Sequence, residues 1–237
     1  MKKIIIANLK MNLTLDEMVN YKNVVEEGEY NDLIICPSYL YLQMMKSKKY
    51  EISAQDAYYI DKGAFTGEVS FYQLKSTGIK YSLIGHSERR HVFNEGNEII
   101  TMKMKSCISN GIIPILCVGE TKEERETGDT FNVIDKQIDT ALEGLNMSNT
   151  IIAYEPVWSI GTGMIPELGE IEEIHLHIKQ LLNKKYNTDS KVLYGGSVKL
   201  DNIEAICGLS SVDGVLIGGA SNNPNTLINM YNIVEKM

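Results

Sequence analysis

The sequence lacks paired cysteines, basic clusters and long apolar runs. Its four cysteines are dispersed, and no two of them form a CxxC pair. Dispersed thiols of this kind are typical of reduced cysteines in a cytosolic protein. No Lys/Arg-rich block occurs, and the formal net charge of the 237 residues is −8 at pH 7. These observations argue against nucleic acid and against an anionic membrane as partners.

No apolar run is long enough to cross a bilayer. The run at the amino end, Ile4-Ile5-Ile6-Ala7, is ended by Asn8 and Lys10, so it is too short for the core of a signal peptide. We therefore expect a cytoplasmic protein. Hydrophobic residues make up 43% and charged residues 23% of the chain, which is ordinary for a soluble domain. The length favours one large domain over residues 1–237.

Eight short apolar runs are separated by segments with helical periodicity. Most runs lack strict alternation of apolar and polar residues, which is typical of parallel strands covered on both faces. The predicted strands are residues 3–7, 33–36, 52–54, 81–84, 112–118, 150–154, 191–194 and 214–217.

Helix signals lie between these runs. Thr14-x-x-Glu17 and Ser70-x-x-Gln73 have the form of capping boxes. Gly78 and Gly111 stand where glycine ends a helix, and Asn223-Pro224 is suited to begin the last one.

Strand then helix, eight times over at roughly 30 residues per unit, predicts an α/β fold built of repeated crossovers. The alternative is an open doubly wound sheet, which usually carries a GxGxxG motif or a P-loop after its first strand. Here that position reads Asn8-Leu9-Lys10. We therefore predict a single (β/α)8 barrel, with eight parallel strands ringed by helices.

One connection is long for an α/β barrel. The segment from Gln55 to Glu68, which we call the arm, follows the third predicted strand and contains Tyr58, Tyr59 and Phe65. The arm could fold against its own barrel. We favour a protruding apolar arm that a partner buries, because exposed aromatic clusters are costly for a monomer.

Polar side chains capable of catalysis gather at the carboxyl ends of the predicted strands. They are Asn8 and Lys10 after the first strand, His86 after the fourth, Cys117 and Glu120 at the fifth, and Glu155 after the sixth. The carboxyl ends of all strands of such a barrel meet at one face, where its active site lies. We therefore expect these side chains to share one site.

Glycine-rich turns follow the last two predicted strands. The turns are Tyr194-Gly195-Gly196-Ser197-Val198 and Gly218-Gly219-Ala220-Ser221. Turns of this kind leave backbone N–H groups open to an anion. Each alone is also an ordinary tight turn, but a pair on strands seven and eight matches the usual phosphate site of α/β barrels.

Glu155 precedes a segment, residues 156–166, that we call the lid. A glutamate at a strand end is most often a solvated charge or a cap. A proline entrance, the only tryptophan of the chain and a glycine-containing tip are instead typical of a loop that closes over ligand. Closure would remove water from the Glu155 carboxylate and suit it to take a proton from a carbon beside a carbonyl. The lid residues are Pro156, Val157, Trp158, Ser159, Ile160, Gly161, Thr162, Gly163, Met164, Ile165 and Pro166.

His86 and Lys10 are candidate electrophiles. Most loop histidines and lysines have no catalytic task, but a place at the barrel mouth suits His86 to bond a substrate oxygen. Lys10 would offer positive charge to a phosphate or to a developing enolate oxygen. A metal site is not indicated, because His175 and His177 would point apart on a helix. No cofactor fingerprint occurs.

Motifs from the first predicted strand to the last resemble those of the triosephosphate isomerase family. They follow in order over nearly the whole chain, so chance agreement is negligible. The motifs are Asn8-Leu9-Lys10-Met11-Asn12, Gly63-Ala64-Phe65-Thr66-Gly67-Glu68, Gly85-His86-Ser87-Glu88-Arg89-Arg90, Cys117-Val118-Gly119-Glu120, Tyr154-Glu155-Pro156-Val157-Trp158, Gly161-Thr162-Gly163, Tyr194-Gly195-Gly196-Ser197-Val198 and Asp213-Gly214-Val215-Leu216-Ile217-Gly218-Gly219-Ala220-Ser221.

The resemblance implies an aldose–ketose isomerase of glycolysis and gluconeogenesis that needs neither metal nor cofactor. It would interconvert D-glyceraldehyde 3-phosphate and dihydroxyacetone phosphate through an enediolate. Glu155 would be the base that shuttles the proton, and His86 a neutral electrophile. Asn8 and Lys10 would bind the substrate, with Lys10 supplying the positive charge. The phosphate would bind to Gly161, Ser197, Gly218 and Gly219.

The resemblance also assigns supporting roles. Glu88 would anchor the catalytic groups, and Cys117 would pack near the base. Phe65 and Thr66 would contact a second subunit, with Thr66 reaching into the partner's site beside Lys10. A homodimer joined through the arm is therefore implied.

Several positions depart from the usual pattern of the family. Leu9 and Leu13 replace Trp and Gly, and Asp56 stands where Asn is common. In the lid, Ser159 replaces Ala, and Met164-Ile165-Pro166 replaces a Lys-Thr-Ala hinge. A proline at the second hinge should stiffen it through its fixed φ, so we expect altered lid kinetics with the chemistry retained.

Two other functions are compatible with a barrel of this kind. One is a related isomerase for another sugar phosphate, which would lack the combination of His86, Glu155 and the lid sequence. The other is a non-catalytic barrel that binds phosphorylated metabolites or a protein. Such a protein could keep the glycine turns but would not need Lys10, His86 and Glu155 together, and their joint presence favours the enzyme.

Overall fold

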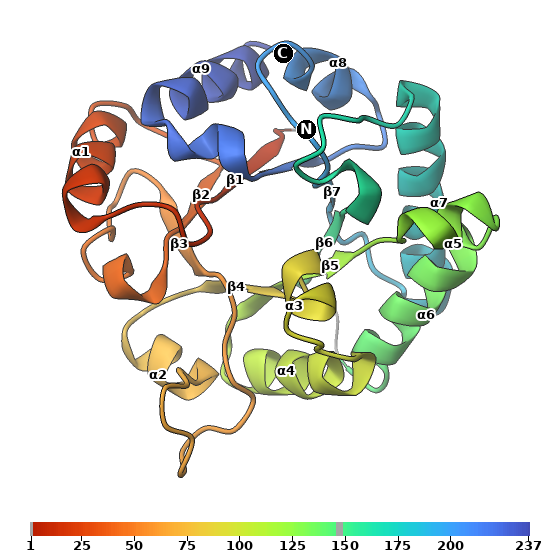
Figure 1. Cartoon of the computed structure of the whole chain (residues 1–237), viewed down its shortest axis with the longest axis horizontal. Helices are drawn as coiled ribbons and strands as arrows, with labels where there is room; N and C mark the ends of the chain where they lie inside the picture. Colours follow the sequence, from red (N-terminus) through yellow and green to blue (C-terminus); the bar gives the residue numbers. More distant parts are fainter. Residues whose placement is uncertain (1, 146–148) are drawn as a thin grey trace.

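The computed structural model describes residues 2–145 and 149–237, and its strands form a closed parallel barrel (Figure 1). β1 pairs with β2 and also with β8, where Ile4 lies opposite Gly214. The predicted barrel is therefore confirmed, and the open sheet is wrong for this chain. The strands are β1 (Ile4–Asn8), β2 (Leu33–Cys36), β3 (Glu51–Ala54), β4 (Tyr81–Ile84), β5 (Ile113–Val118), β6 (Ile151–Tyr154), β7 (Val192–Tyr194) and β8 (Gly214–Ile217).

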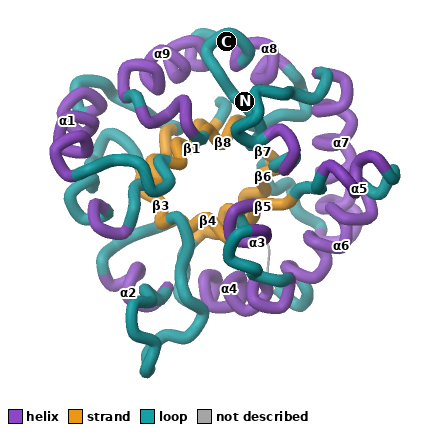
Figure 2. The backbone as a smooth tube through the Cα atoms, in the orientation of Figure 1, coloured by secondary structure: helices purple, strands orange, loops and turns teal. Residues whose placement is uncertain are grey.

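Helices ring the barrel on the outside (Figures 1 and 2). Both predicted capping boxes are present, at Thr14 and at Ser70. Gly78 and Gly111 adopt positive φ just beyond helix ends, and Pro224 begins the last helix. The helices are α1 (Leu15–Val25), α2 (Phe71–Ser76), α3 (Ser87–His91), α4 (Asn97–Ser109), α5 (Lys122–Glu126), α6 (Thr130–Leu142), α7 (Leu168–Tyr186), α8 (Ile203–Gly208) and α9 (Pro224–Glu235). No helix in the described ranges is long and apolar enough to cross a membrane.

The second repeat departs from the predicted strand–helix pattern. Between β2 and β3 the chain forms one short 3-10 helix, η1 (Tyr39–Tyr41), followed by turns. This connection is shorter than its neighbours, and Leu42 and Met45 still bury their side chains beneath it. The two residues are three positions apart, so a turn-like backbone places both on the same face.

The apolar core has two layers, separated by the sheet. Neighbouring residues of β1 belong to different clusters, since Ile5 and Ala7 pack with the helices whereas Ile6 packs with other strand residues. Successive side chains of a strand point to opposite faces, so the second cluster fills the barrel interior. It includes Leu83, Ile115 and Leu193, all fully buried. A filled interior leaves the carboxyl rim as the place where a ligand can bind.

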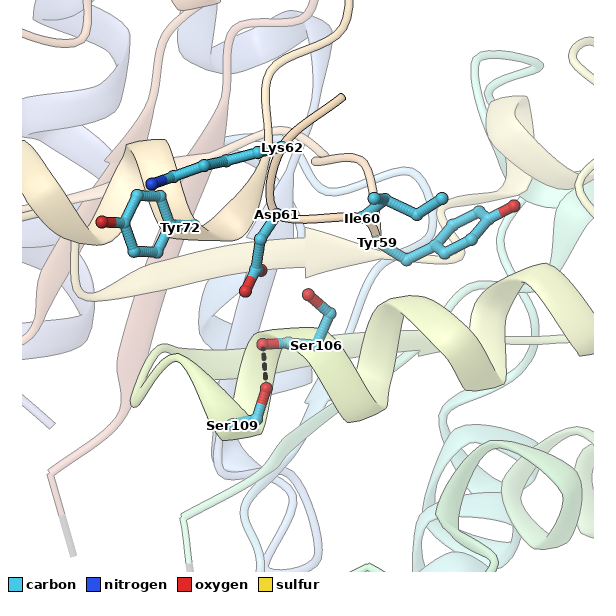
Figure 3. Close-up of a pocket in the computed structure, with 7 residues that line it drawn as sticks. All are labelled: Tyr59, Ile60, Asp61, Lys62, Tyr72, Ser106 and Ser109. Carbon is cyan, nitrogen blue, oxygen red and sulfur yellow. Dashed lines mark hydrogen bonds between the residues drawn. The ribbon is translucent and has the colours of Figure 1, made fainter. Parts of the chain in front are cut away.

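The arm, residues 55–68, leaves the barrel beside α2 and projects outward (Figure 1). Its base is closed by the Tyr58 N–H, which donates to Val69 O at 2.8 Å, whereas residues 61–68 are exposed. Figure 3 shows Asp61 pointing toward α4, where Asn110 Nδ2 donates to its carboxylate at 3.1 Å. The base of the arm therefore packs on its own barrel, while the tip protrudes as predicted.

Candidate active site

A cavity of about 570 Å3 opens at the carboxyl ends of the strands. It brings together all eight residues that were predicted to act on or bind the substrate: Asn8, Lys10, His86, Glu155, Gly161, Ser197, Gly218 and Gly219. A hollow of about 660 Å3 beside the arm is lined by Tyr59, Ile60, Asp61, Lys62, Tyr72, Ser106 and Ser109 (Figure 3). That second hollow lacks both a histidine–carboxylate pair and a glycine turn. The chemistry therefore gathers in the first cavity.

Glu155 and His86 face each other across the barrel mouth. Glu155 directly follows β6 and His86 lies just after β4, yet His86 Nε2 is 3.2 Å from Glu155 Oε1. The other carboxylate oxygen accepts the backbone N–H of Ser87 at 3.1 Å. Glu155 is only 2% and His86 only 5% exposed. A buried carboxylate is held here by two N–H donors, which balance part of its desolvation.

The backbone of α3 selects the tautomer of His86. His86 is the N-cap of this helix, and its Nδ1 accepts the backbone N–H of Glu88 at 3.2 Å. A nitrogen that accepts a hydrogen bond carries no proton, so the hydrogen-bond network assigns the ring proton to Nε2. His86 is therefore neutral in this arrangement, and its Nε2–H points at the carboxylate of Glu155.

Two glycines make room for Glu155. A Cβ atom on Gly119 would lie 1.9 Å from the carbonyl oxygen of Glu155. A Cβ on Gly195 would lie 2.8 Å from the Glu155 Cγ. Neither position tolerates a side chain without displacing Glu155, its backbone at Gly119 and its side chain at Gly195, because contacts this short are not tolerated in a close-packed interior. The glycine after β7 thus serves the base as well as the predicted phosphate turn.

Arg90 and Cys117 support the floor of the site. The Arg90 guanidinium donates to Gly85 O at 2.8 Å and to Cys117 O at 2.9 Å, which ties the end of β4 to β5. Burial lowers the pKa of Arg90 to about 10, so the group remains charged near neutral pH. Burial, followed by the nearby Glu155 charge, raises the pKa of the Cys117 thiol well above its usual range. Cys117 therefore packs beside Glu155 as a neutral thiol.

Lys10 lies on a strained turn beside His86 and Glu155. Its backbone has φ +51, which is uncommon for a residue other than glycine. Asn8 Oδ1 accepts the Lys10 N–H at 3.1 Å, and Gln55 Nε2 donates to the Lys10 carbonyl at 2.8 Å. The Lys10 ammonium lies 2.5 Å from Glu88 Oε1. Glu88 thus contacts Lys10 through its side chain and His86 through its backbone N–H.

The lid is fastened at its first turn. Trp158 Nε1 donates to Glu120 Oε1 at 2.9 Å, and the Arg125 guanidinium lies over the indole ring at 4.6 Å from its centroid. Glu120 is fully buried and also accepts from the hydroxyl of Tyr154. Burial raises the pKa of Glu120. Glu120 was predicted to belong to the site, and the structure shows that it holds the lid.

A buried charge cluster explains the departure at Asp56. Lys103 is 2% exposed, and its ammonium donates to both carboxylate oxygens of Asp56, at 2.8 and 2.6 Å, and to Glu95 at 2.7 Å. Arg89 also donates to Glu95 and lies 3.3 Å from Asp56. Two acids therefore balance two bases, and an asparagine at position 56 would leave one positive charge uncompensated. Burial raises the pKa of Asp56, although Lys103 opposes this shift.

Some contributors could not be found from the sequence. Gln55 donates to the carbonyl of Lys10, and the Ser87 N–H donates to the carboxylate of Glu155. A glutamine and a backbone amide carry no sequence signal of their own. Lys103 and Glu95 carry no such signal either, because the burial of a charge becomes visible only in the folded chain. Among the described residues, no three His, Cys, Asp or Glu side chains gather to hold a metal ion.

Comparison with known proteins is consistent with this geometry. Residues 3–234 match the family model described as triosephosphate isomerase. A triosephosphate isomerase from Aquifex aeolicus is 42% identical over 95% of this chain and 97% of its own length. Those from Dictyoglomus thermophilum and Alkaliphilus metalliredigens are 40% and 39% identical, over 99% and 98% of this chain and 99% of their own lengths. The chain therefore belongs to the triosephosphate isomerase family and is an isomerase.

Proposed function

We propose that Glu155, His86, Lys10 and Asn8 carry out the interconversion of D-glyceraldehyde 3-phosphate and dihydroxyacetone phosphate, a step of glycolysis and gluconeogenesis. The observation that supports these roles is the 3.2 Å approach of His86 Nε2 to Glu155 Oε1 at the mouth of the cavity. A base beside a neutral hydrogen-bond donor is the arrangement that proton transfer next to a carbonyl requires.

The proton moves in two steps. The Glu155 carboxylate takes a proton from the carbon beside the carbonyl, while the His86 Nε2–H donates to the carbonyl oxygen as negative charge develops there. The Lys10 ammonium stabilises the resulting enediolate through its positive charge, and the side-chain amide of Asn8 donates a hydrogen bond. The hydroxyl proton of the neighbouring carbon then passes to the former carbonyl oxygen, with His86 as its carrier between the two oxygens, and Glu155 delivers its proton to the former carbonyl carbon. No redox change occurs, and atoms and charge balance within the substrate.

The phosphate is held by backbone N–H groups of Gly161, Ser197, Gly218 and Gly219, which line the same cavity as His86 and Glu155. Gly161 belongs to the lid, so closure adds a donor as it removes water. An enediolate phosphate that meets water tends to lose its phosphate group, and exclusion of solvent therefore protects the product.

An assay of the purified protein tests the proposal. Wild type should isomerise glyceraldehyde 3-phosphate in the presence of EDTA, because no step requires a metal. Glu155→Gln keeps the size of the side chain and removes the base, so its kcat should fall by about 10³-fold or more. An inactive wild type, or a variant with full activity, would contradict the assignment.

We further propose that one catalytic domain spans residues 1–237 and works in the cytoplasm as a homodimer. A hollow of about 340 Å3 adjoins Lys10 and shares Asn8 and His86 with the catalytic cavity. Around this hollow large apolar side chains are exposed, among them Met11 at 93% and Phe93 at 60%. The tip of the arm, with Phe65 and Thr66, is of the right character to fill it in a second subunit.

Sedimentation at several protein concentrations tests the dimer. Wild type should sediment as a dimer, and Thr66→Arg should favour the monomer, because a charged side chain would have to enter the hollow beside Lys10 and Arg89. Lys62→Gln is the matched control, since Lys62 also lies in the arm but contacts Tyr72 of its own chain. A wild-type monomer at all concentrations would contradict the dimer.

A further inference from the structure

Ser159, which replaces the usual alanine of the lid, has a fully buried hydroxyl that touches three parts of the site. Its Oγ donates to the carbonyl oxygen of Met164 at 2.7 Å and accepts the backbone N–H of Ser197 at 3.3 Å. The hydroxyl of Tyr194 lies 3.4 Å away. Ser159 therefore joins the first hinge of the lid to its second hinge and to the turn after β7.

The hydrogen-bonding capacity of this hydroxyl is fully used. A serine hydroxyl offers one proton and two acceptor positions. The proton goes to Met164 O, and the Ser197 N–H and the Tyr194 hydroxyl take the two lone pairs. A second bond runs the other way, because Ser197 Oγ donates to the Ser159 carbonyl at 2.6 Å. Ser159 and Ser197 are thus clasped together, with the amide of Ser197 directed at the lid.

The same Ser197 amide is one of the four donors assigned to the substrate phosphate. A backbone N–H makes one good hydrogen bond at a time, so Ser159 and a phosphate oxygen compete for it. The bond to a phosphate is charge-assisted and stronger than a neutral bond of 3.3 Å. Phosphate binding would therefore detach the Ser197 amide from Ser159 and loosen the hinge at the moment the ligand arrives. An alanine at this position has no acceptor and offers no such competition.

We propose that Ser159 is a positioning residue whose hydroxyl holds the lid in its ligand-free arrangement by competing with the substrate phosphate for the Ser197 N–H. The proposal rests on the assignment of Ser197 to the phosphate site. It makes substrate affinity, and not the chemical step, the quantity that Ser159 controls, because Ser159 touches neither Glu155 nor His86. The Ser159 hydroxyl thereby lowers affinity for phosphate esters and links their binding to lid movement.

Ser159→Ala tests the proposal with inorganic phosphate as the probe. Phosphate binding is followed by the fluorescence of Trp158, the only tryptophan, which lies next to Ser159. Loss of the competing acceptor should tighten phosphate binding about threefold to tenfold. The KM for glyceraldehyde 3-phosphate should fall by a similar factor with kcat within about twofold of wild type. A general loss of lid structure would instead raise KM.

Thr162→Ala is the matched control. Its hydroxyl donates to Trp158 O at 3.0 Å and accepts the Met164 N–H at 3.2 Å, so it bonds only within the lid. This variant should not bind phosphate more tightly than wild type. Ser159→Cys keeps the volume of the side chain but is a weaker acceptor, and it should give an intermediate affinity.

Unchanged or weaker phosphate binding in Ser159→Ala would overturn the proposal, and so would equal tightening in Thr162→Ala. If Ser159→Ala melts at a lower temperature than wild type, Ser159→Cys decides, and the absence of tighter phosphate binding in that variant would also overturn the proposal. Each would be obtained with an active wild-type enzyme. A wild type that fails to isomerise the substrate contradicts the proposed function instead, so the two failures are told apart.

Discussion

The two halves of the site are held in different ways. Glu155 directly follows β6, and His86 lies two residues after β4. Both are almost fully buried and are fixed by backbone N–H groups of α3. The lid is more exposed, with Met164 at 48% and Ile165 at 38%, and side-chain hydroxyl and indole groups hold it in place. Backbone bonds at strand ends keep the reacting groups in register, whereas side-chain bonds can be exchanged when a ligand binds. In the proposed mechanism, chemistry therefore depends on the rigid half and enclosure depends on the lid.

The largest expected effect comes from breaking the rigid half at His86. His86→Gln loses the imidazole N–H that is to polarise the carbonyl, so kcat should fall about 10²- to 10³-fold with a small change in KM. Steady-state kinetics measure this. His91→Gln is the control, because His91 is exposed and ends the same helix. A fall in kcat of less than tenfold in His86→Gln would mean that His86 is not the electrophile.

Acid should lower the free energy of unfolding through His175, which packs behind the rigid half of the site. This histidine of α7 is fully buried beside Tyr154 and Tyr194, the last residues of β6 and β7, and burial followed by the charge of Lys179 lowers its pKa to about 3. The folded state then binds fewer protons than the unfolded state, where the pKa is near 6.5. This contribution to stability is complete above pH 6.5 and is lost as the pH falls toward 3.

The free energy of unfolding should be about 2 kcal/mol lower at pH 5 than at pH 7. Urea unfolding at the two pH values measures it. His175→Phe cannot titrate and should lose about 2 kcal/mol less between pH 7 and pH 5 than wild type does. His177→Gln is the control, since His177 is partly exposed and already pairs with Asp135 at 2.6 Å. Equal acid sensitivity of wild type and His175→Phe would contradict the role of His175.

A smaller effect is expected from loosening the lid at Trp158. Trp158→Phe keeps an aromatic ring but loses the bond to Glu120, so the lid is less well placed to close. We expect kcat/KM to fall about tenfold, with KM and kcat both affected. Steady-state kinetics at neutral pH test this. A loss as large as that of His86→Gln would erase the distinction between the two halves.

The smallest effect concerns the charge at the mouth. Lys199 lines the cavity, and its ammonium would lie 3.8 Å from a Cβ on Gly163 of the lid. It has no ion pair among the described residues, whereas Lys10 is paired with Glu88. In a chain of net charge −8, Lys199→Gln should raise KM about threefold at low salt and hardly at all at high salt.

Lys48→Gln changes the net charge equally and is the control for this effect. Lys48 is exposed and precedes β3, so it lies at the opposite end of the barrel. A similar rise in KM for both variants would show that the overall field matters more than the lysine at the mouth.

The sequence predicted the strands and the polar residues at their ends better than the connections between them. Apolar runs located every strand to within one residue, and the polar residues at their ends fell around one cavity, because parallel strands share a direction. The prediction of a helix in the second strand–helix unit was wrong, since the short connection between β2 and β3 buries Leu42 and Met45 without an α-helix. Helical periodicity alone does not separate a helix from a series of turns with the same spacing.

Side-chain networks escaped the sequence for a physical reason. Ser159 and Met164 were recognised as departures and Ser197 as a phosphate residue, but the hydrogen bonds that join the three arise only from tertiary structure. Asp56 was recognised as a departure, but its partner Lys103 lies on α4 and is buried only after folding. The role of Pro166 in lid kinetics stays a prediction, and so do the catalytic roles and the dimer.

The central claim is that the position of the Glu155 carboxylate, and not its charge alone, sets the rate. Glu155→Asp tests this most directly, because it keeps the charge and withdraws the carboxylate by about one bond length. We predict that kcat falls about 10²-fold while KM stays within a few-fold of wild type. Turnover close to that of wild type would contradict the claim.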